Sequence, residues 1–185
     1  MKAIKQSFRN SIAPWYDQSV MSSRSQNKQK GYPGDFETIE GVYNMEPLSD
    51  GIGYYLDIFY LNAQLAQAIV NRKNYTRDKI CKYISDCDSF TALNVASGSC
   101  KKWFKIAANR PCNGIHLTLL DFDGDSLDYS IHLLNTTNSG ISAYPLKKNV
   151  LKFELENKNL NTTDDYDFVY SIGLYDYIPD KVLKS

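Results

Sequence analysis

The residues best suited to chemistry lie between Thr91 and Asp121. Residues 92–95 are a short apolar segment, residues 96–99 read Ala-Ser-Gly-Ser, and residues 100–108 place apolar side chains at helical spacing. This pattern predicts a buried strand, a tight turn and a helix. Such a turn presents backbone N–H groups to a ligand, and an acid that ends the next strand can bind ribose hydroxyls. The segment therefore predicts one nucleoside-binding half of an α/β fold, with Asp121 as the ribose acid.

The turn itself is a weak motif. A dinucleotide-binding fingerprint needs three glycines, and here only Gly98 is a glycine, with Ala96 and Cys100 in place of the others. A structural turn and a binding turn are equally compatible with these residues alone. The rest of the chain has to decide between them.

The elements after this segment alternate between strand and helix. Strands are expected at 115–120, 141–144 and 166–172, a helix at 124–135, and the start of another helix at Pro179. Alternation of this kind predicts a doubly wound parallel sheet with right-handed crossovers, that is, a Rossmann-like α/β fold.

The chain before residue 89 is expected to be helical. Asp35 is placed to cap a helix over 36–43, a long amphipathic helix is expected over 54–70, and a further helix over 76–86. Residues 1–30 show little periodicity and are interpreted as a polar leader. The predicted organisation is a leader (1–30), a helical cap (31–88) and a cofactor-binding domain (89–185).

Composition restricts the partners. The chain has 21 basic and 21 acidic residues, so its zero net charge gives no electrostatic footprint for nucleic acid or for an anionic membrane. No apolar run is long enough to span a bilayer, and the first ten residues lack the apolar core of a signal peptide. The four cysteines form neither a C-x-x-C pair nor a metal-binding spacing. We therefore expect a cytoplasmic protein without a metal site.

Three segments resemble the class I S-adenosylmethionine-dependent methyltransferases. They are residues 31–37 (GYPGDFE), 119–123 (LLDFD) and 166–177 (YDFVYSIGLYDY), and they are most similar to a bacterial subgroup that makes methyl esters of 3-hydroxy fatty acids. The resemblance covers the chain from about Gly31 onward. It implies methyl transfer from S-adenosylmethionine to a small or lipidic acceptor such as a fatty-acid carboxylate.

The resemblance also implies where the cofactor binds. The turn at 94–100 would lie against its amino-acid part, Asp121 against the ribose, residues 149–150 beside the adenine, and residues 171–173 near the methyl group. The implied cofactor-binding residues are Asn94, Ala96, Ser97, Gly98, Asp121, Phe122, Asn149, Val150, Ser171 and Gly173. Asn94 stands where many members have an acid, and Ala96 and Cys100 replace glycines.

Two further candidates lie in the helical cap. Tyr32 could cover the cleft, and Arg72 could pair with the carboxylate of the cofactor, although an arginine near the end of a helix is equally expected for structural reasons. No catalytic residue is identified, because a carboxylate acceptor needs no base. His116 and His132 are expected to be structural.

The resemblance further implies a sheet without its C-terminal part, because sheets of the family continue past the fourth strand. An open sheet edge invites a second copy or a complementing chain. Two alternatives to the enzyme therefore stay open: a truncated cofactor-binding or interaction protein without catalysis, and a nucleotide-dependent oxidoreductase. The single glycine and the segment 171–173 disfavour the oxidoreductase.

Overall fold

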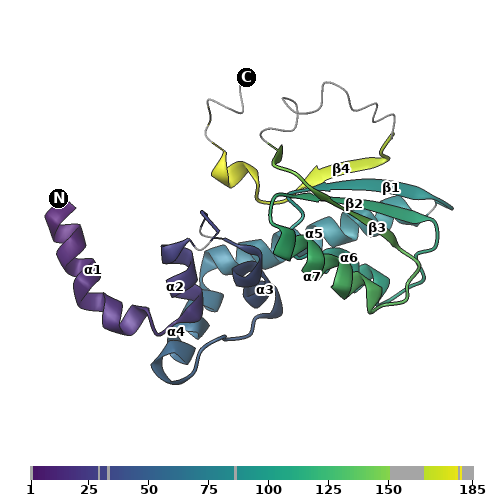
Figure 1. The fold of residues 1–185 in the computed structure, drawn as a ribbon. Coiled ribbons are helices and arrows are strands. Elements are labelled where there is room, and N and C mark those ends of the chain that lie inside the picture. The colour runs from purple at the N-terminus through teal and green to yellow at the C-terminus, as the bar shows by residue number, and fades with distance from the viewer. Residues whose placement is uncertain are drawn as a thin grey trace. The chain divides into compact units, whose positions relative to one another are not determined.

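The structure is a computed structural model that describes residues 2–28, 30–32, 34–85, 87–150, 165–178 and 180. Its contacts divide the chain into an N-terminal unit, Met1–Asn71, and a C-terminal unit, Arg72–Ser185 (Figure 1). The predicted division lay at residue 88, whereas this boundary falls inside one helix, α5 (Gln64–Ile84). Pro179, the predicted helix start, lies outside the described residues.

The N-terminal unit is helical. Residues 2–27, interpreted from the sequence as a polar leader, form two helices, and Met21 on the second is fully buried. It packs in a small core with Val42, Leu61 and Ala66. Asp35 caps the third helix as predicted, because its carboxylate accepts a 2.9 Å hydrogen bond from the Thr38 N–H. The helices are α1 (Lys2–Tyr16), α2 (Val20–Asn27), α3 (Phe36–Asn44), α4 (Gly51–Asn62) and the first part of α5.

The helix break lies at Ala63, not between residues 70 and 76 as predicted. Ala63 is extended, with φ −64° and ψ 146°, and α5 then runs without interruption to Ile84. Residues 71–75 contain neither glycine nor proline, and the Thr76 hydroxyl donates a 2.9 Å bond to the Arg72 carbonyl one turn earlier. The basic residues there resemble a helix end but lie in the helix interior.

In its described residues, the C-terminal unit contains four parallel strands in the order β3-β2-β1-β4. This arrangement confirms the predicted Rossmann-like α/β fold, with helical elements preceding the sheet. The strands are β1 (Phe90–Val95), β2 (Ile115–Asp121), β3 (Ser142–Lys147) and β4 (Phe168–Ser171), with α6 (Lys101–Ala107) after β1, α7 (Gly124–Asn135) after β2, and the short helix η2 (Tyr175–Tyr177) after β4.

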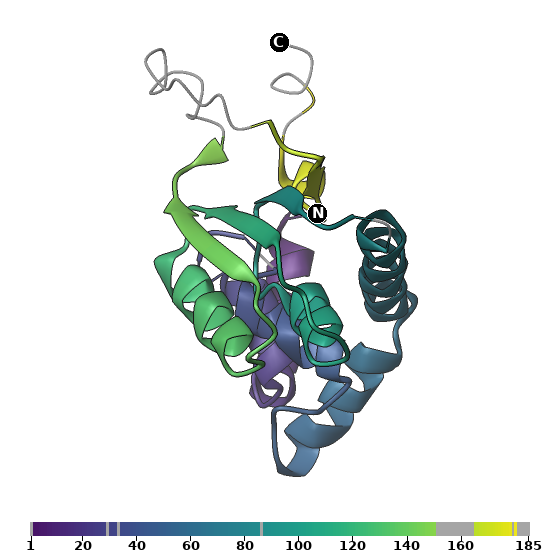
Figure 2. The same cartoon turned by 90° about the vertical axis from the view of Figure 1, so that its right-hand side faces the viewer.

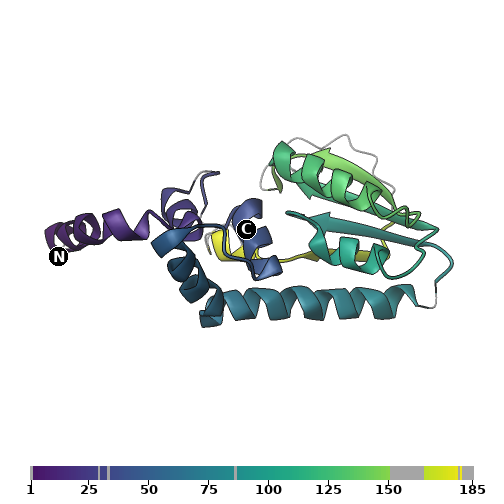
Figure 3. The same cartoon turned by 90° about the horizontal axis from the view of Figure 1, so that it is seen from below.

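Helices α7, α6 and the C-terminal part of α5 lie in that order along one face of the sheet (Figures 2 and 3). The core between them includes the fully buried Trp103, Leu117 and Leu119. Residues of β1 alternate between buried and half-buried, so Leu93 and Val95 point to the opposite face. Among the described helices of the C-terminal unit, none covers that face (Figures 2 and 3).

The strand order creates a switch point between β1 and β4. The chain proceeds from β1 outward to β2 and β3, and then returns to the other side of β1 to form β4. In open α/β sheets, ligands bind in the crevice at the carboxyl ends of the two strands where the order reverses. Here those two strand ends are Val95 and Ser171, which are paired in register.

Candidate functional site

The turn between β1 and α6 has an unusual backbone. Ala96, Gly98 and Cys100 have φ of 53°, 55° and 55°, in the left-handed region that favours glycine. The turn therefore keeps a left-handed shape at two positions without glycine. A Cβ placed on Gly98 would meet no atom within 4 Å, so the turn faces open space there and a ligand can approach its backbone.

Three hydrogen bonds join this turn to β2 and α7. The Ser97 N–H donates to the Leu120 carbonyl at 3.1 Å, and the Gly98 N–H donates to Asp121 Oδ2 at 3.0 Å. The Ser130 hydroxyl on α7 donates to the Gly98 carbonyl at 2.7 Å. Because β2 and α7 both hold it, the turn is preorganised for a ligand.

Asp121 ends β2 beside the turn, where the sequence predicted it. Its side chain is buried, and its Oδ1 accepts a 3.0 Å bond from the Asp123 N–H. Burial raises the pKa of the Asp121 carboxyl above its usual value, although bonds from backbone N–H groups oppose the shift. A carboxylate has about four lone-pair sites, so this one can still accept hydroxyl donors. Phe122 follows with its ring half exposed.

Several buried polar atoms at this edge lack a hydrogen-bond partner. Within the described residues they include Asn94 Oδ1, the hydroxyls of Ser97 and Ser99 in the turn, and the hydroxyl of Ser171 at the end of β4. A buried polar group without a partner costs about 1–3 kcal/mol, and such groups are rare in native proteins. We call these four residues the polar cradle. Its composition fits a ligand that carries hydroxyl and amino groups.

Two ionisable residues lie beside the polar cradle. Lys102 is buried, its Nζ lies 5.0 Å from the centroid of the Tyr170 ring, and burial lowers the pKa of its ammonium group. Burial raises the pKa of the Cys100 thiol to about 11. The Cys100 side chain is therefore a neutral thiol at neutral pH and unsuited to be a nucleophile.

The segments after β3 and β4 bring further candidates to the same edge. The Lys148 N–H donates a 2.9 Å bond to the Asp121 carbonyl, which places Asn149 and Val150 just beyond Asp121. Past β4, the Arg72 guanidinium lies 3.1 Å from where a Cβ on Gly173 would be.

Arg72 also has an acidic neighbour. Its Nη1 lies 3.4 Å from Asp176 Oδ2, and both side chains are exposed. An exposed pair of this kind is weak, so it leaves Arg72 available to a ligand carboxylate. Tyr32 lies in the N-terminal unit, between α2 and α3, and its role stays a prediction.

Sequence reasoning missed three residues. Ser99 belongs to the polar cradle, Ser130 holds the turn, and Lys102 lies buried beside Tyr170. Ser130 could have been noticed, because it lies three residues after Leu127 on the apolar face of its helix. Lys102 had a weaker signal, a lysine in the first turn of a helix, where the dipole disfavours it.

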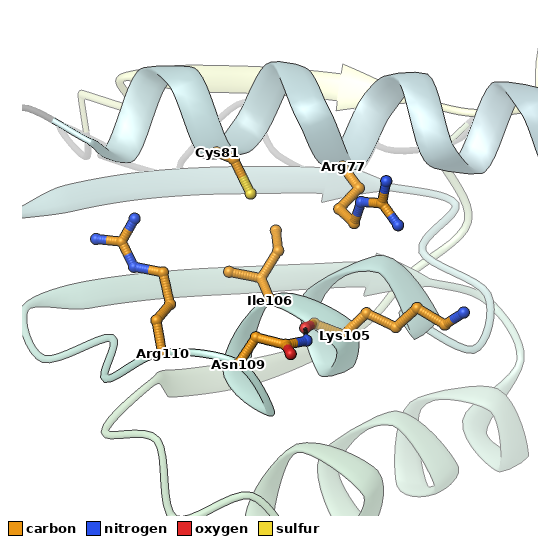
Figure 4. Close-up of a pocket in the computed structure, with 6 residues that line it drawn as sticks. All are labelled: Arg77, Cys81, Lys105, Ile106, Asn109 and Arg110. Atoms are coloured by element: carbon orange, nitrogen blue, oxygen red, sulfur yellow. Dashed lines mark hydrogen bonds between the residues drawn. The ribbon is translucent and has the colours of Figure 1, made fainter.

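A separate cavity of about 270 Å³ lies between α5 and α6 (Figure 4). It contains no residue predicted for cofactor binding. Its lining is rich in cationic side chains, and Figure 4 shows Cys81 and Ile106 between Arg110 on one side and Arg77 on the other. The lining residues are Arg77, Cys81, Lys105, Ile106, Asn109 and Arg110.

Two kinds of feature are not found among the described residues. No group of three or more His, Cys, Asp or Glu side chains is arranged to hold a metal ion. In the same part of the chain, no helix combines the length and apolar character needed to cross a membrane. His116 and His132 lie in β2 and α7, the strand and helix expected for them, and both are exposed.

The comparisons with known proteins concern the fold. The chain matches no protein-family profile and no curated protein. The crystal structure of a possible exported protein from Bordetella parapertussis is similar, with a TM-score of 0.61 and 19% sequence identity. The similarity covers 79% of this chain and 45% of that one, so this chain spans less than half the length of its structural neighbour. At this identity the likeness shows a shared fold and nothing further.

Proposed function

We propose that this chain is an S-adenosylmethionine-dependent methyltransferase that acts on a small or lipidic acceptor, such as a fatty-acid carboxylate. The observation that carries the proposal is the polar cradle at the β1–β4 switch point, beside a buried aspartate that ends β2. Switch points of open α/β sheets are where nucleoside-containing ligands bind.

The residues at this edge fit the parts of S-adenosylmethionine. Asp121 would accept the ribose hydroxyls, and the open backbone of Gly98 would lie against the amino-acid part. The exposed Phe122 ring and residues 149–150 would border the adenine. Arg72, with its exposed guanidinium, would bind the carboxylate.

S-adenosylmethionine, when bound, supplies a methyl group on a positively charged sulfur, and transfer to an acceptor oxygen breaks the sulfur–carbon bond. The protein then has to align the acceptor and keep water out. A carboxylate acceptor carries its own negative charge, so no side chain has to remove a proton. This fits a site where Cys100 is a neutral thiol and where no histidine is among the residues assigned to the cofactor.

The test is calorimetric titration with S-adenosylhomocysteine, the demethylated product. Asp121→Asn should weaken binding by about 1.5–3 kcal/mol, because a charge-assisted contact to the ribose is lost. Ser130→Ala is the control, since it loosens the same turn without removing a contact to the ligand. Equal affinities of wild type and Asp121→Asn, in a variant that remains folded, would remove the ribose assignment.

Turnover separates the enzyme from its main alternative. A radioactive methyl donor and a panel of 3-hydroxy and unsubstituted fatty acids should give base-labile methyl esters. Tight binding of S-adenosylhomocysteine without ester formation would instead support a cofactor-binding protein that lacks catalysis.

The proposal includes a cytoplasmic location and association with a second copy or a complementing chain. The free thiols of Cys81, Cys87, Cys100 and Cys112 support a reducing compartment. The structural neighbour is called a possible exported protein, so the location needs its own test. Cell fractionation should recover the protein with cytosolic markers, and recovery outside the cytosol would contradict this location.

A further inference from the structure

Helix α1 exposes a stripe of large apolar side chains. Ile4, Phe8 and Trp15 are 75%, 63% and 58% exposed. Their spacing of four and seven residues places them on one face of the helix. None of them belongs to the core of the N-terminal unit, which is formed by α2 to α5. Large apolar side chains that lie exposed along one face of a helix indicate an interaction site.

The charge of this helix is entirely basic. Lys5 and Arg9 are exposed next to the stripe, and residues 1–16 contain no acidic side chain. The first 30 residues contain six basic residues and one acidic residue. The N-terminal segment is therefore basic, although acidic residues elsewhere bring the net charge of the whole chain to zero.

We propose that α1 lies on an anionic lipid surface, with Ile4, Phe8 and Trp15 in the apolar boundary and Lys5 and Arg9 against lipid phosphates. A basic amphipathic helix with aromatic residues in its apolar stripe is typical of helices that lie in the membrane interface. Nucleic acid would match the charge but would leave the apolar stripe in water. The surface is separate from the proposed cofactor site and does not depend on methyl transfer.

Trp15 provides a direct measurement. The chain has two tryptophans, and Trp103 is fully buried, so only Trp15 can move from water into lipid. Vesicles of phosphatidylcholine mixed with phosphatidylglycerol should shift the tryptophan emission of the full chain to shorter wavelength. Vesicles of phosphatidylcholine alone should give a much smaller shift, and Trp15→Phe should abolish it.

Variants separate charge from apolar contact. Lys5→Gln combined with Arg9→Gln should lower the vesicle partition coefficient about 30-fold at low salt. Phe8→Ser should lower it about tenfold or more. Tyr75→Ser on α5 is the matched control, because Tyr75 is 64% exposed outside α1 and its loss should leave partitioning unchanged.

Three results would overturn the proposal. They are unchanged Trp15 emission with anionic vesicles, equal partitioning into neutral and anionic vesicles, and partitioning that Phe8→Ser and Tyr75→Ser reduce equally. The alternative is that a second copy of the chain covers the stripe, and light scattering on the same samples tests this by measuring the molar mass. A dimer that Phe8→Ser dissociates, without vesicle binding, would assign the stripe to a second copy of the chain.

Discussion

Ala96 and Cys100 hold a backbone conformation that glycine adopts without cost. The left-handed region costs a non-glycine residue about 1–2 kcal/mol, so the turn carries strain at both positions. Three hydrogen bonds, to Leu120, Asp121 and Ser130, hold the turn against that strain. The turn therefore keeps its left-handed shape at a cost in stability.

Ala96→Gly should raise the free energy of unfolding by about 1 kcal/mol, because the relief of strain exceeds the added entropy of the unfolded chain. Urea unfolding measures the change. The control is Ala68→Gly at an exposed position inside α5, which should lower the stability by about 1 kcal/mol. If Ala96→Gly is as destabilising as the control, the turn does not store strain at residue 96.

Asp121 should give the stability a distinctive pH dependence. Burial raises its pKa, so between the ordinary value of 3.8 and the raised value the folded state binds more protons than the unfolded state. Its contribution to stability is thus greatest at acid pH and declines as the pH rises through the raised pKa. In Asp121→Asn, which is neutral throughout, this decline is absent.

Urea unfolding of wild type and Asp121→Asn checks this dependence. The difference between their free energies of unfolding should move in favour of the wild type as the pH is lowered from neutral towards about pH 4. A difference that moves the other way would mean that the N–H donors of Gly98 and Asp123 outweigh burial and lower the pKa.

At the scale of elements, prediction succeeded where a local signal marks both ends. Helix α7 begins and ends as predicted, because Asp123 caps it and its apolar spacing is regular.

Strand β3 runs on to Lys147, three residues past its predicted end, through Pro145. Proline normally argues against a strand interior, but β3 pairs only with β2 in the described sheet, and an edge strand tolerates it.

Strand β4 is joined to α6 by a specific contact. The Trp103 indole N–H donates a 2.7 Å hydrogen bond to the Tyr170 hydroxyl, and Trp103 is fully buried. Tyr170→Phe should leave that N–H without its acceptor and lower the free energy of unfolding by about 1–3 kcal/mol. Tyr144→Phe, at a 57% exposed position on β3, should have almost no effect. Thermal unfolding compares them, and equal effects would show that the bond contributes nothing net.

At the scale of the whole molecule, the sequence predicted the α/β fold and which strand ends carry polar residues. Topology alone then brings residues 94–98, 121, 149–150 and 171–173 to one edge, because parallel strands share their carboxyl ends. The hydrogen bond from Ser130 to Gly98 could not be predicted, since it depends on how α7 packs. The helical order of residues 2–27 was also missed, because their polar composition outweighed the spacing of a few apolar residues.

The sheet has a second apolar surface with consequences for association. On the face opposite the helices Leu93 and Val95 are half-buried, and Val169 on β4 is 57% exposed. In the described part of the chain β4 pairs with β1 alone, and an edge strand of this kind can pair with another chain. We expect concentration-dependent self-association through β4.

Val169→Lys should reduce this association, because a charge on an edge strand opposes pairing. Size-exclusion chromatography with light scattering measures it. Tyr144→Lys, at an equally exposed position on the other edge, is the control and should associate like the wild type. If both variants lose association equally, general solubility and not β4 is responsible, and a wild type that is monomeric at every concentration would exclude the contact.

The position of the boundary between the two units in the sequence has a practical consequence for producing either unit alone. Domains are usually separated by a flexible linker that proteases cut, but here the boundary after Asn71 lies inside the backbone ladder of α5. Cleavage there would require the helix to unwind. Each fragment would then keep only a short segment of α5, close to or below the length of about 12–15 residues that an isolated helix needs. Neither unit is therefore suited to separate expression or to fusion with another protein when it ends at this boundary. A fragment that contains either unit would have to include the whole of α5.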